Sequence, residues 1–148
     1  MLPLSPSLLP NLIAACLYAA AIVLQGTGLA RGVKADKRLL GLLGALAVIA
    51  QGTALFWQLL TPLGLSLDFF SAASLIATAV IAITLLACLR IPVENLLLLL
   101  FPLGLLTALI AQFAPSGTVP LINESPGILA HILLSILAYG LFLSLIHI

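Results

Sequence analysis

The stretch Ser125–Phe142, SPGILAHILLSILAYGLF, is a hydrophobic run long enough to cross a bilayer as a helix. Ser125 can cap this helix, and Pro126 fits its first position, where a missing N–H is not needed. The run contains one imidazole, His131, and ionisable side chains at membrane depth are costly and usually functional. We therefore predict a membrane-spanning helix with His131 as its candidate site residue.

Two further polar residues share the predicted helix face with His131. Ser135 and Tyr139 follow it at i+4 and i+8, which places the three side chains in one stripe. Ser135 and Tyr139 are therefore candidates for lining a site at His131. The alternative is helix packing, with the hydroxyls bonded to a backbone carbonyl and the imidazole hydrogen-bonded between helices.

The composition predicts an integral membrane protein. Of 148 residues, 64% are hydrophobic and 6% are charged, which is too few charges to coat a soluble globule. The formal net charge of +1 provides no basic patch, so nucleic-acid binding is excluded. Cys16 and Cys88 form no CxxC pair, so we interpret them as small buried apolar residues rather than a redox or zinc site.

Alternation of hydrophobic runs with polar connections predicts an all-α, polytopic transmembrane bundle. Five spans are expected, at about residues 12–29, 39–60, 69–89, 95–113 and 127–148, after an irregular lead-in. All five Lys and Arg residues lie in the first and third connections, whereas the second and fourth hold only Asp68 and Glu124. The positive-inside rule then predicts an N-terminus outside and His131 in the outer part of the membrane.

Polar residues also occur inside the second and third spans. Gln51 is expected near the bilayer centre, where a neutral amide needs a partner, so it should face the bundle interior. Gln58 lies seven residues further on the same face, and Trp57 should anchor at the interface. Hydroxyl residues on the third span follow at i, i+3 and i+7, a spacing typical of helix packing: Ser71, Ser74 and Thr78.

No sequence feature points to bond-making catalysis. No carboxylate lies deep in a predicted span, and catalytic triads and glycine-rich phosphate loops are absent from the sequence. The last residues, Leu143–Ile148 (LSLIHI), match the translation of a transposon-end adapter used in preparing sequencing libraries. We therefore expect that residues 1–142 are the N-terminal part of a longer protein, and we do not consider His147 a ligand.

At PGILAHILLSILAYGLF the sequence resembles the cytochrome c assembly family, specifically its small branch with the YpjD- and HemX-like membrane proteins. Two further stretches agree, FFSAASLIATAVIAI at 69–83 and RIPVENLLLLLFPLGLLTALIAQFAPS at 90–116. The resemblance covers the chain up to Phe142. It implies a multi-pass protein of the bacterial inner membrane with about eight spans, of which this chain would contain five.

The resemblance also implies a function in cytochrome c-type biogenesis. In the pattern LxHxxLSxxxY, the family's histidine corresponds to His131, which would be an axial ligand of a haem iron on the outer side. The implied partners are the lipid bilayer, haem and other cytochrome biogenesis membrane proteins. Gln51 stands where many relatives carry a histidine, and Ser71 where they carry an asparagine, so a second histidine would come from further helices.

Two other functions remain open on the sequence. One is a non-haem structural or regulatory subunit of a membrane complex, in which His131 serves helix packing. The other is a small-molecule or ion permease, although no broken-helix pair is visible in the sequence. The tryptophan-rich WWD segment of the larger relatives is not present.

Overall fold

The computed structural model of the protein describes residues 5–33, 35–61, 64–65 and 68–114, together with residues 127, 131, 134, 135, 138, 139 and 142. The described chain contains four long helices: α1 (Leu8–Ala30), α2 (Lys37–Leu59), α3 (Phe69–Cys88) and α4 (Glu94–Phe113). Two strands of two residues each, β1 (Leu60–Thr61) and β2 (Gly64–Leu65), pair antiparallel between α2 and α3. The described fold is helical, as the sequence predicts.

Local sequence signals explain most helix ends. Asp36 caps α2, where its Oδ1 accepts a hydrogen bond from the Arg38 backbone N–H at 2.9 Å. Asp68 caps α3 in the same way. Helix α1 ends at Ala30, and Gly32 just beyond it has a φ of 66°, which lets the Val33 N–H bond back to the Gly28 carbonyl at 2.9 Å.

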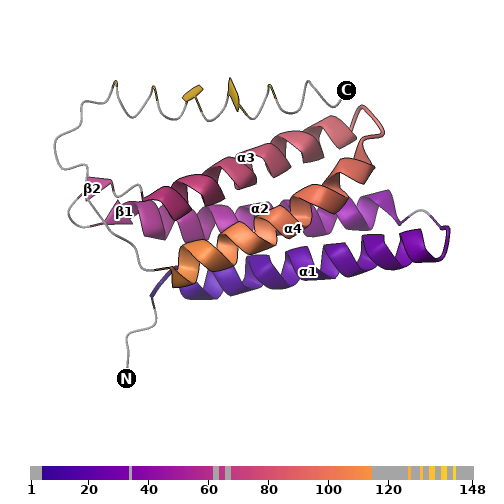
Figure 1. Ribbon diagram of the computed structural model, residues 1–148, viewed down its shortest axis with the longest axis horizontal. Coiled ribbons are helices and arrows are strands. Elements are labelled where there is room, and N and C mark those ends of the chain that lie inside the picture. Colours follow the sequence, from indigo (N-terminus) through magenta and orange to yellow (C-terminus); the bar gives the residue numbers. More distant parts are fainter. Residues whose placement is uncertain are drawn as a thin grey trace.

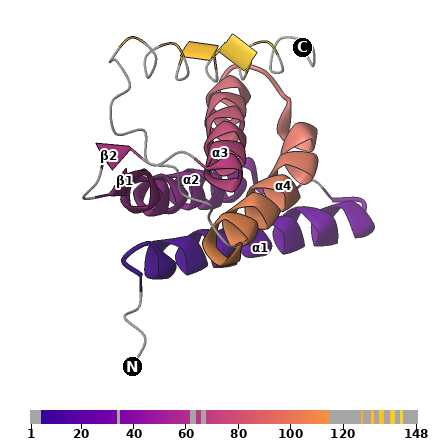
Figure 2. The ribbon, with the colours of Figure 1, turned by 60° about the vertical axis from the view of Figure 1, so that its left-hand side comes forward.

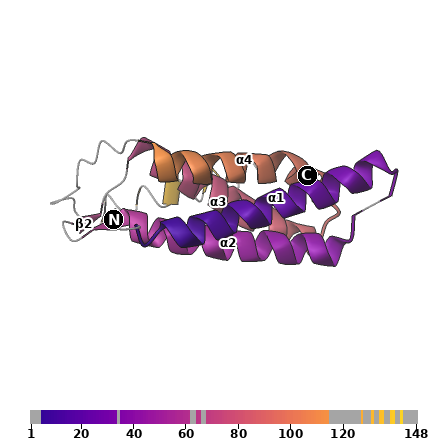
Figure 3. The ribbon, with the colours of Figure 1, turned by 90° about the horizontal axis from the view of Figure 1, so that it is seen from below.

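The four helices run alternately up and down and pack in a ring (Figure 1). Helix α1 lies beside α2 and α4, and α3 closes the ring by contacting the same two helices (Figures 2 and 3). Short connections between consecutive antiparallel helices produce this arrangement. The ring brings α1 and α4, which are far apart in sequence, into direct contact.

The packing differs from that in a soluble bundle. The interior combines large side chains, such as Phe101 and Ile81, with many small and polar residues, such as Ala14, Ala47 and Thr84. Large aliphatic side chains cover the outside, as Leu86 does at 65% exposure. All four helices are long and apolar enough to cross a membrane. This combination indicates a membrane protein whose helices contact lipid with their large apolar side chains.

The structure changes the expected limits of the first span. Helix α1 begins at Leu8, earlier than predicted. Pro10 does not prevent this start, because it lies in the first turn, where backbone N–H groups have no acceptor within the helix. Cys88 is buried as expected, but the interpretation of Cys16 as buried is wrong: it is exposed. The inward-facing stripe of α1 includes Tyr18, and a residue two positions away lies on the opposite side of the helix.

The fifth predicted span lies almost entirely outside the described residues. Its described members are helical: Gly127, His131, Leu134, Ser135, Ala138, Tyr139 and Phe142. Residues 143–148, including His147, are also outside the described part.

The charged side chains of the described chain, except Asp68, gather at one end of the bundle, which we call the basic end. The α1–α2 and α3–α4 connections both lie there, opposite the chain's N-terminus (Figure 1). They contribute Arg31 and Arg90, and α2 begins there with Lys37 and Arg38. Lys37 forms an ion pair with Glu94 at the start of α4, with Nζ and Oε1 2.7 Å apart. This pair joins α2 to α4.

Close packing of α4 against its neighbours depends on Gly104. A Cβ at this position would lie 2.6 Å from the Cδ1 of Ile81 and 3.0 Å from the Cζ of Tyr18. We expect Gly104→Leu to lower the free energy of unfolding in detergent by about 1–3 kcal/mol, because overpacking forces the helices apart. Gly52→Leu is the matched control, since no atom lies within 4 Å of its Cβ position. Equal thermal unfolding of the two variants would contradict the packing described.

Candidate functional site

Polar residues of α1 form an inward stripe at heptad spacing. Asn11, Tyr18 and Gln25 are all buried, and each lies seven residues from the next. At 3.6 residues per turn, this spacing keeps the three side chains on one helix face. Each of them bonds to a different part of the bundle. We call the three groups of bonded polar residues, one at each height along the bundle, its polar levels.

The middle level joins three helices through consecutive hydrogen bonds. The Tyr18 hydroxyl donates to Oε1 of Gln51 at 2.7 Å, and Nε2 of Gln51 donates to Oγ of Ser74 at 2.9 Å. Tyr18 and Gln51 have no exposed surface. The Thr78 hydroxyl donates to the Ser74 carbonyl one turn away at 2.7 Å. Gln51 therefore faces the bundle interior, with α1 on one side and α3 on the other.

Helix α4 reaches the same level through aromatic packing. The Tyr18 ring lies 5.8 Å from the Phe101 ring, measured between centroids, with the planes tilted by 39°. Phe101 is fully buried, and Gly104 leaves room for the edge of the tyrosine ring. The middle level thus holds all four described helices together, three by hydrogen bonds and the fourth by ring contact.

The level at the end opposite the basic end is organised around Gln112 of α4. Its Oε1 accepts hydrogen bonds from Ser7 at 3.2 Å, Asn11 at 3.1 Å and Gln58 at 3.2 Å. Asn11 also donates to the Ala108 carbonyl at 3.1 Å. These bonds fasten the start of α1 and the end of α2 to the last turn of α4.

The level at the basic end has an unsatisfied group. Nε2 of Gln25 donates to the backbone carbonyl of Glu94 at 2.8 Å. Its Oε1 is buried and has no hydrogen-bond partner, alone among the buried side-chain N and O atoms of the described residues. A buried polar atom without a partner costs about 1–3 kcal/mol, so this oxygen marks a place where a donor would bind.

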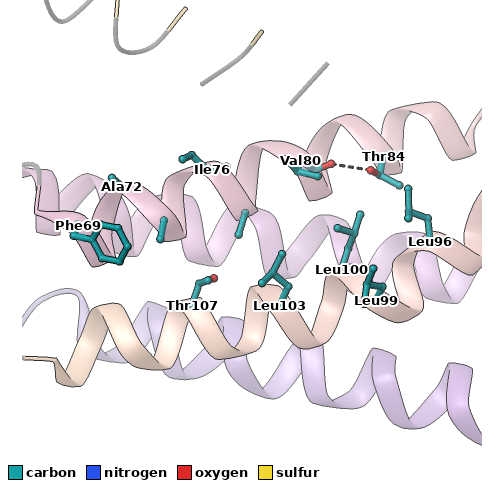
Figure 4. Close-up of a pocket in the computed structure, with 12 residues that line it drawn as sticks. Phe69, Ala72, Ile76, Val80, Thr84, Leu96, Leu99, Leu100, Leu103 and Thr107 are labelled. Carbon is teal, nitrogen blue, oxygen red and sulfur yellow. Dashed lines mark hydrogen bonds between the residues drawn. The ribbon is translucent and has the colours of Figure 1, made fainter. Parts of the chain in front are cut away.

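An apolar groove of about 710 Å³ lies between α3 and α4 (Figure 4). Phe69, Ile76 and Val80 on α3 face Leu99 and Leu103 on α4 across it. Its two threonine hydroxyls donate to carbonyls of their own helices, Thr84 to Val80 at 2.8 Å and Thr107 to Gly104 at 3.1 Å. The groove therefore offers hydrophobic contact and no hydrogen-bond donor to an occupant.

The predicted residues of the fifth span, His131, Ser135 and Tyr139, lie on one helix face, on which Ser135 is partly buried. His131 and Tyr139 are exposed, Tyr139 by 69%. The Ser135 hydroxyl donates to the His131 carbonyl at 2.8 Å, so it bonds backbone rather than the imidazole. No described residue forms a hydrogen bond with the imidazole. The described part of the chain also contains no group of three His, Cys, Asp or Glu side chains that could hold a metal ion.

The other predicted site residues have structural roles in the described part. Ser74 is the third member of the middle level, bonded to Gln51. Ser71 is buried in the first turn of α3, where its N–H donates to the capping carboxylate of Asp68 at 3.1 Å. Trp57 is 53% exposed and packs edge-to-face on Phe56, with the ring centroids 5.8 Å apart.

Sequence reasoning missed the stripe of α1, although a signal was present. Asn11, Tyr18 and Gln25 are polar residues of one long apolar run, and their seven-residue spacing matches that of Gln51 and Gln58 on the next helix. In lipid, such groups must be satisfied within the protein. The spacing alone could have identified α1 and α2 as neighbours through their polar faces.

Comparisons of the chain with protein-family models, curated proteins and solved structures find no match.

The middle level predicts a coupling between Tyr18 and Gln51. Tyr18→Phe and Gln51→Leu should each lower the free energy of unfolding by about 0.5–1 kcal/mol, the range typical of such hydrogen bonds in membrane proteins. In the Gln51→Leu background, Tyr18→Phe should cost nothing, because the hydroxyl has already lost its acceptor. Unfolding of the four proteins in a double-mutant cycle measures this coupling. Additive effects would mean that the two side chains act independently.

Proposed function

We propose that the protein is a haem-handling membrane protein of cytochrome c assembly type, which binds haem through His131 at the outer side of the membrane. The observation that carries the proposal is an imidazole on an exposed helical face, in the sequence pattern LxHxxLSxxxY. The handling of a cofactor needs no catalytic constellation in the protein itself. Other cytochrome biogenesis proteins of the same membrane are the partners that this function implies.

The chemistry of the His131 face fits a porphyrin. An imidazole nitrogen is a common axial ligand of haem iron. Leu134 and Phe142 lie on the same helix at i+3 and i+11 and are exposed by 63% and 60%, which provides apolar surface for the ring. Tyr139 at i+8 adds a hydroxyl for a polar edge. Haem bound there would supply a redox-active iron, while the chain's residues hold and orient the ring.

The charge distribution supports an orientation for this site. Basic residues gather at the end of the bundle that holds the α1–α2 and α3–α4 connections. By the positive-inside rule this end faces the cytoplasm of a bacterial inner membrane, and the N-terminus lies outside. A fifth span over residues 127–148 then enters from the outer face, with His131 within its first two turns.

Absorption spectroscopy tests haem ligation. We expect the protein, purified in detergent from a host with ample haem, to show a Soret band that His131→Ala removes. His147→Ala is the matched control, because it deletes the same side chain near the end of the chain and should leave the band unchanged. The far-ultraviolet circular dichroism of both variants should match that of the parent.

Two outcomes would contradict the proposal. A Soret band that survives in His131→Ala would place the haem on other residues. A colourless protein under haem-replete conditions would favour the alternative of a structural subunit, in which the exposed His131 face packs against a partner helix.

Cysteine labelling tests the orientation. In a background of Cys16→Ala and Cys88→Ala, we expect Ser5→Cys to react with a membrane-impermeant maleimide in intact spheroplasts. Val33→Cys, which is exposed at the basic end, should react only after the membrane is permeabilised. The reverse labelling pattern would place the N-terminus in the cytoplasm and the His131 face on the wrong side.

A further inference from the structure

A second pocket lies at the basic end of the bundle, between the end of α1, the start of α2 and the start of α4. We call it the basic-end pocket; its volume is about 530 Å³. Gln25, Lys37, Glu94 and Asn95 contribute polar side chains to it, and Leu29 contributes apolar surface. The basic-end pocket therefore differs from the aliphatic groove between α3 and α4, and can hold a group with both polar and apolar parts.

The acceptor in this pocket is defined by the orientation of the Gln25 amide. Nε2 donates to the Glu94 carbonyl at 2.8 Å, and the flipped amide would place two carbonyl oxygens in contact. Oε1 therefore stays an acceptor, without a partner among the described residues, on a side chain that is only 8% exposed. The last torsion of glutamine is broad, so a small rotation of the amide can present Oε1 to a donor that enters the pocket.

Among the described residues that line the pocket, one side chain is cationic, Lys37, and one is anionic, Glu94, and these two form the 2.7 Å ion pair. The Lys37 side chain is 52% exposed, and an exposed ion pair is weak enough to open towards a ligand. A ligand with one positive and one negative group would replace the pair without leaving a net charge behind. The orphan oxygen of Gln25 requires that the positive group carry N–H donors.

We propose that the basic-end pocket binds a phosphate joined to a primary ammonium, presented as the head group of a phosphatidylethanolamine lipid. The ammonium donates to Oε1 of Gln25 and faces the carboxylate of Glu94, while the phosphate meets the ammonium of Lys37. Leu29, which is 70% exposed, also lines the pocket and offers apolar surface to an acyl chain. A choline head group carries the same charges but has no N–H donor, and a glycerol head group has no positive charge.

Native mass spectrometry tests the proposal on the full chain, delipidated in detergent and titrated with palmitoyl-oleoyl lipids. We expect phosphatidylethanolamine to bind roughly tenfold more tightly than phosphatidylcholine, because a hydrogen bond to a charged donor is worth about that factor. Phosphatidylglycerol should bind to the basic surface without this preference and weaken as salt rises. Gln25→Leu should reduce the ethanolamine-to-choline ratio to about one.

Two controls separate recognition from folding. Gln58→Leu makes the same change at the opposite end of the bundle and should leave the ratio unchanged. Glu94→Gln keeps the backbone carbonyl that Gln25 holds but removes the carboxylate, so it should lower the ratio even if Gln25→Leu fails to fold. Equal binding of ethanolamine and choline lipids by the parent would overturn the proposal, and so would a preference that survives both Gln25→Leu and Glu94→Gln.

A competition arm distinguishes the source of the head group. Soluble phosphoethanolamine at millimolar concentration should not displace the lipid, because it lacks the chains that contact the bundle's apolar surface. Displacement at concentrations similar to those of the lipid would overturn the lipid assignment and identify a soluble zwitterion as the ligand.

Discussion

The hydrogen bond from Tyr18 to Gln51, at 2.7 Å in the middle of the bundle, is the constraint on which the rest of the structure depends. Lipid provides no partner for a phenol or an amide, so these groups must meet inside the protein. Their meeting fixes the height of α1 against α2, and the bond from Gln51 to Ser74 fixes α3 at the same height. The Tyr18 ring then sets the position of α4 through Phe101. One polar level thereby defines the register of four helices whose outer surfaces are nearly uniform in chemistry.

The requirement that polar side chains find partners inside the protein is met differently at the two ends of the bundle. Asn11 finds acceptors on Gln112 and Ala108, so the end of the bundle opposite the basic end is closed by hydrogen bonds. Among the described residues, Gln25 bonds to the Glu94 carbonyl, and its own oxygen has no hydrogen-bond partner there. A bundle held rigidly in the middle and at one end can tolerate this loss at the other. An unsatisfied acceptor beside a pocket is a feature expected of a binding site rather than of a packing interface.

The sequence predicts the four described helices and the inward direction of Gln51. Both follow from one segment at a time: from its hydropathy, and from the cost of exposing an amide without a hydrogen-bond partner to lipid. It does not predict the partner of Gln51, since that depends on which helices are neighbours, and an apolar run is compatible with several arrangements. The bond from Gln25 to Glu94 was hidden for another reason: its acceptor is a backbone carbonyl, which leaves no trace in side-chain patterns. The early start of α1 was missed because prolines in a first helical turn resemble an irregular lead-in.

The arrangement of polar groups also limits where a cofactor could be held. A ligand in the middle of the described bundle would have to break the bonds of Gln51 to Tyr18 and Ser74, and it would displace rings packed around Gly104. Those contacts hold the helices in register, so an interior site would compete with folding. A side chain outside this network can bind and release a cofactor without that cost. In the proposed function the ligand is His131, which lies outside this network of Tyr18, Gln51 and Ser74.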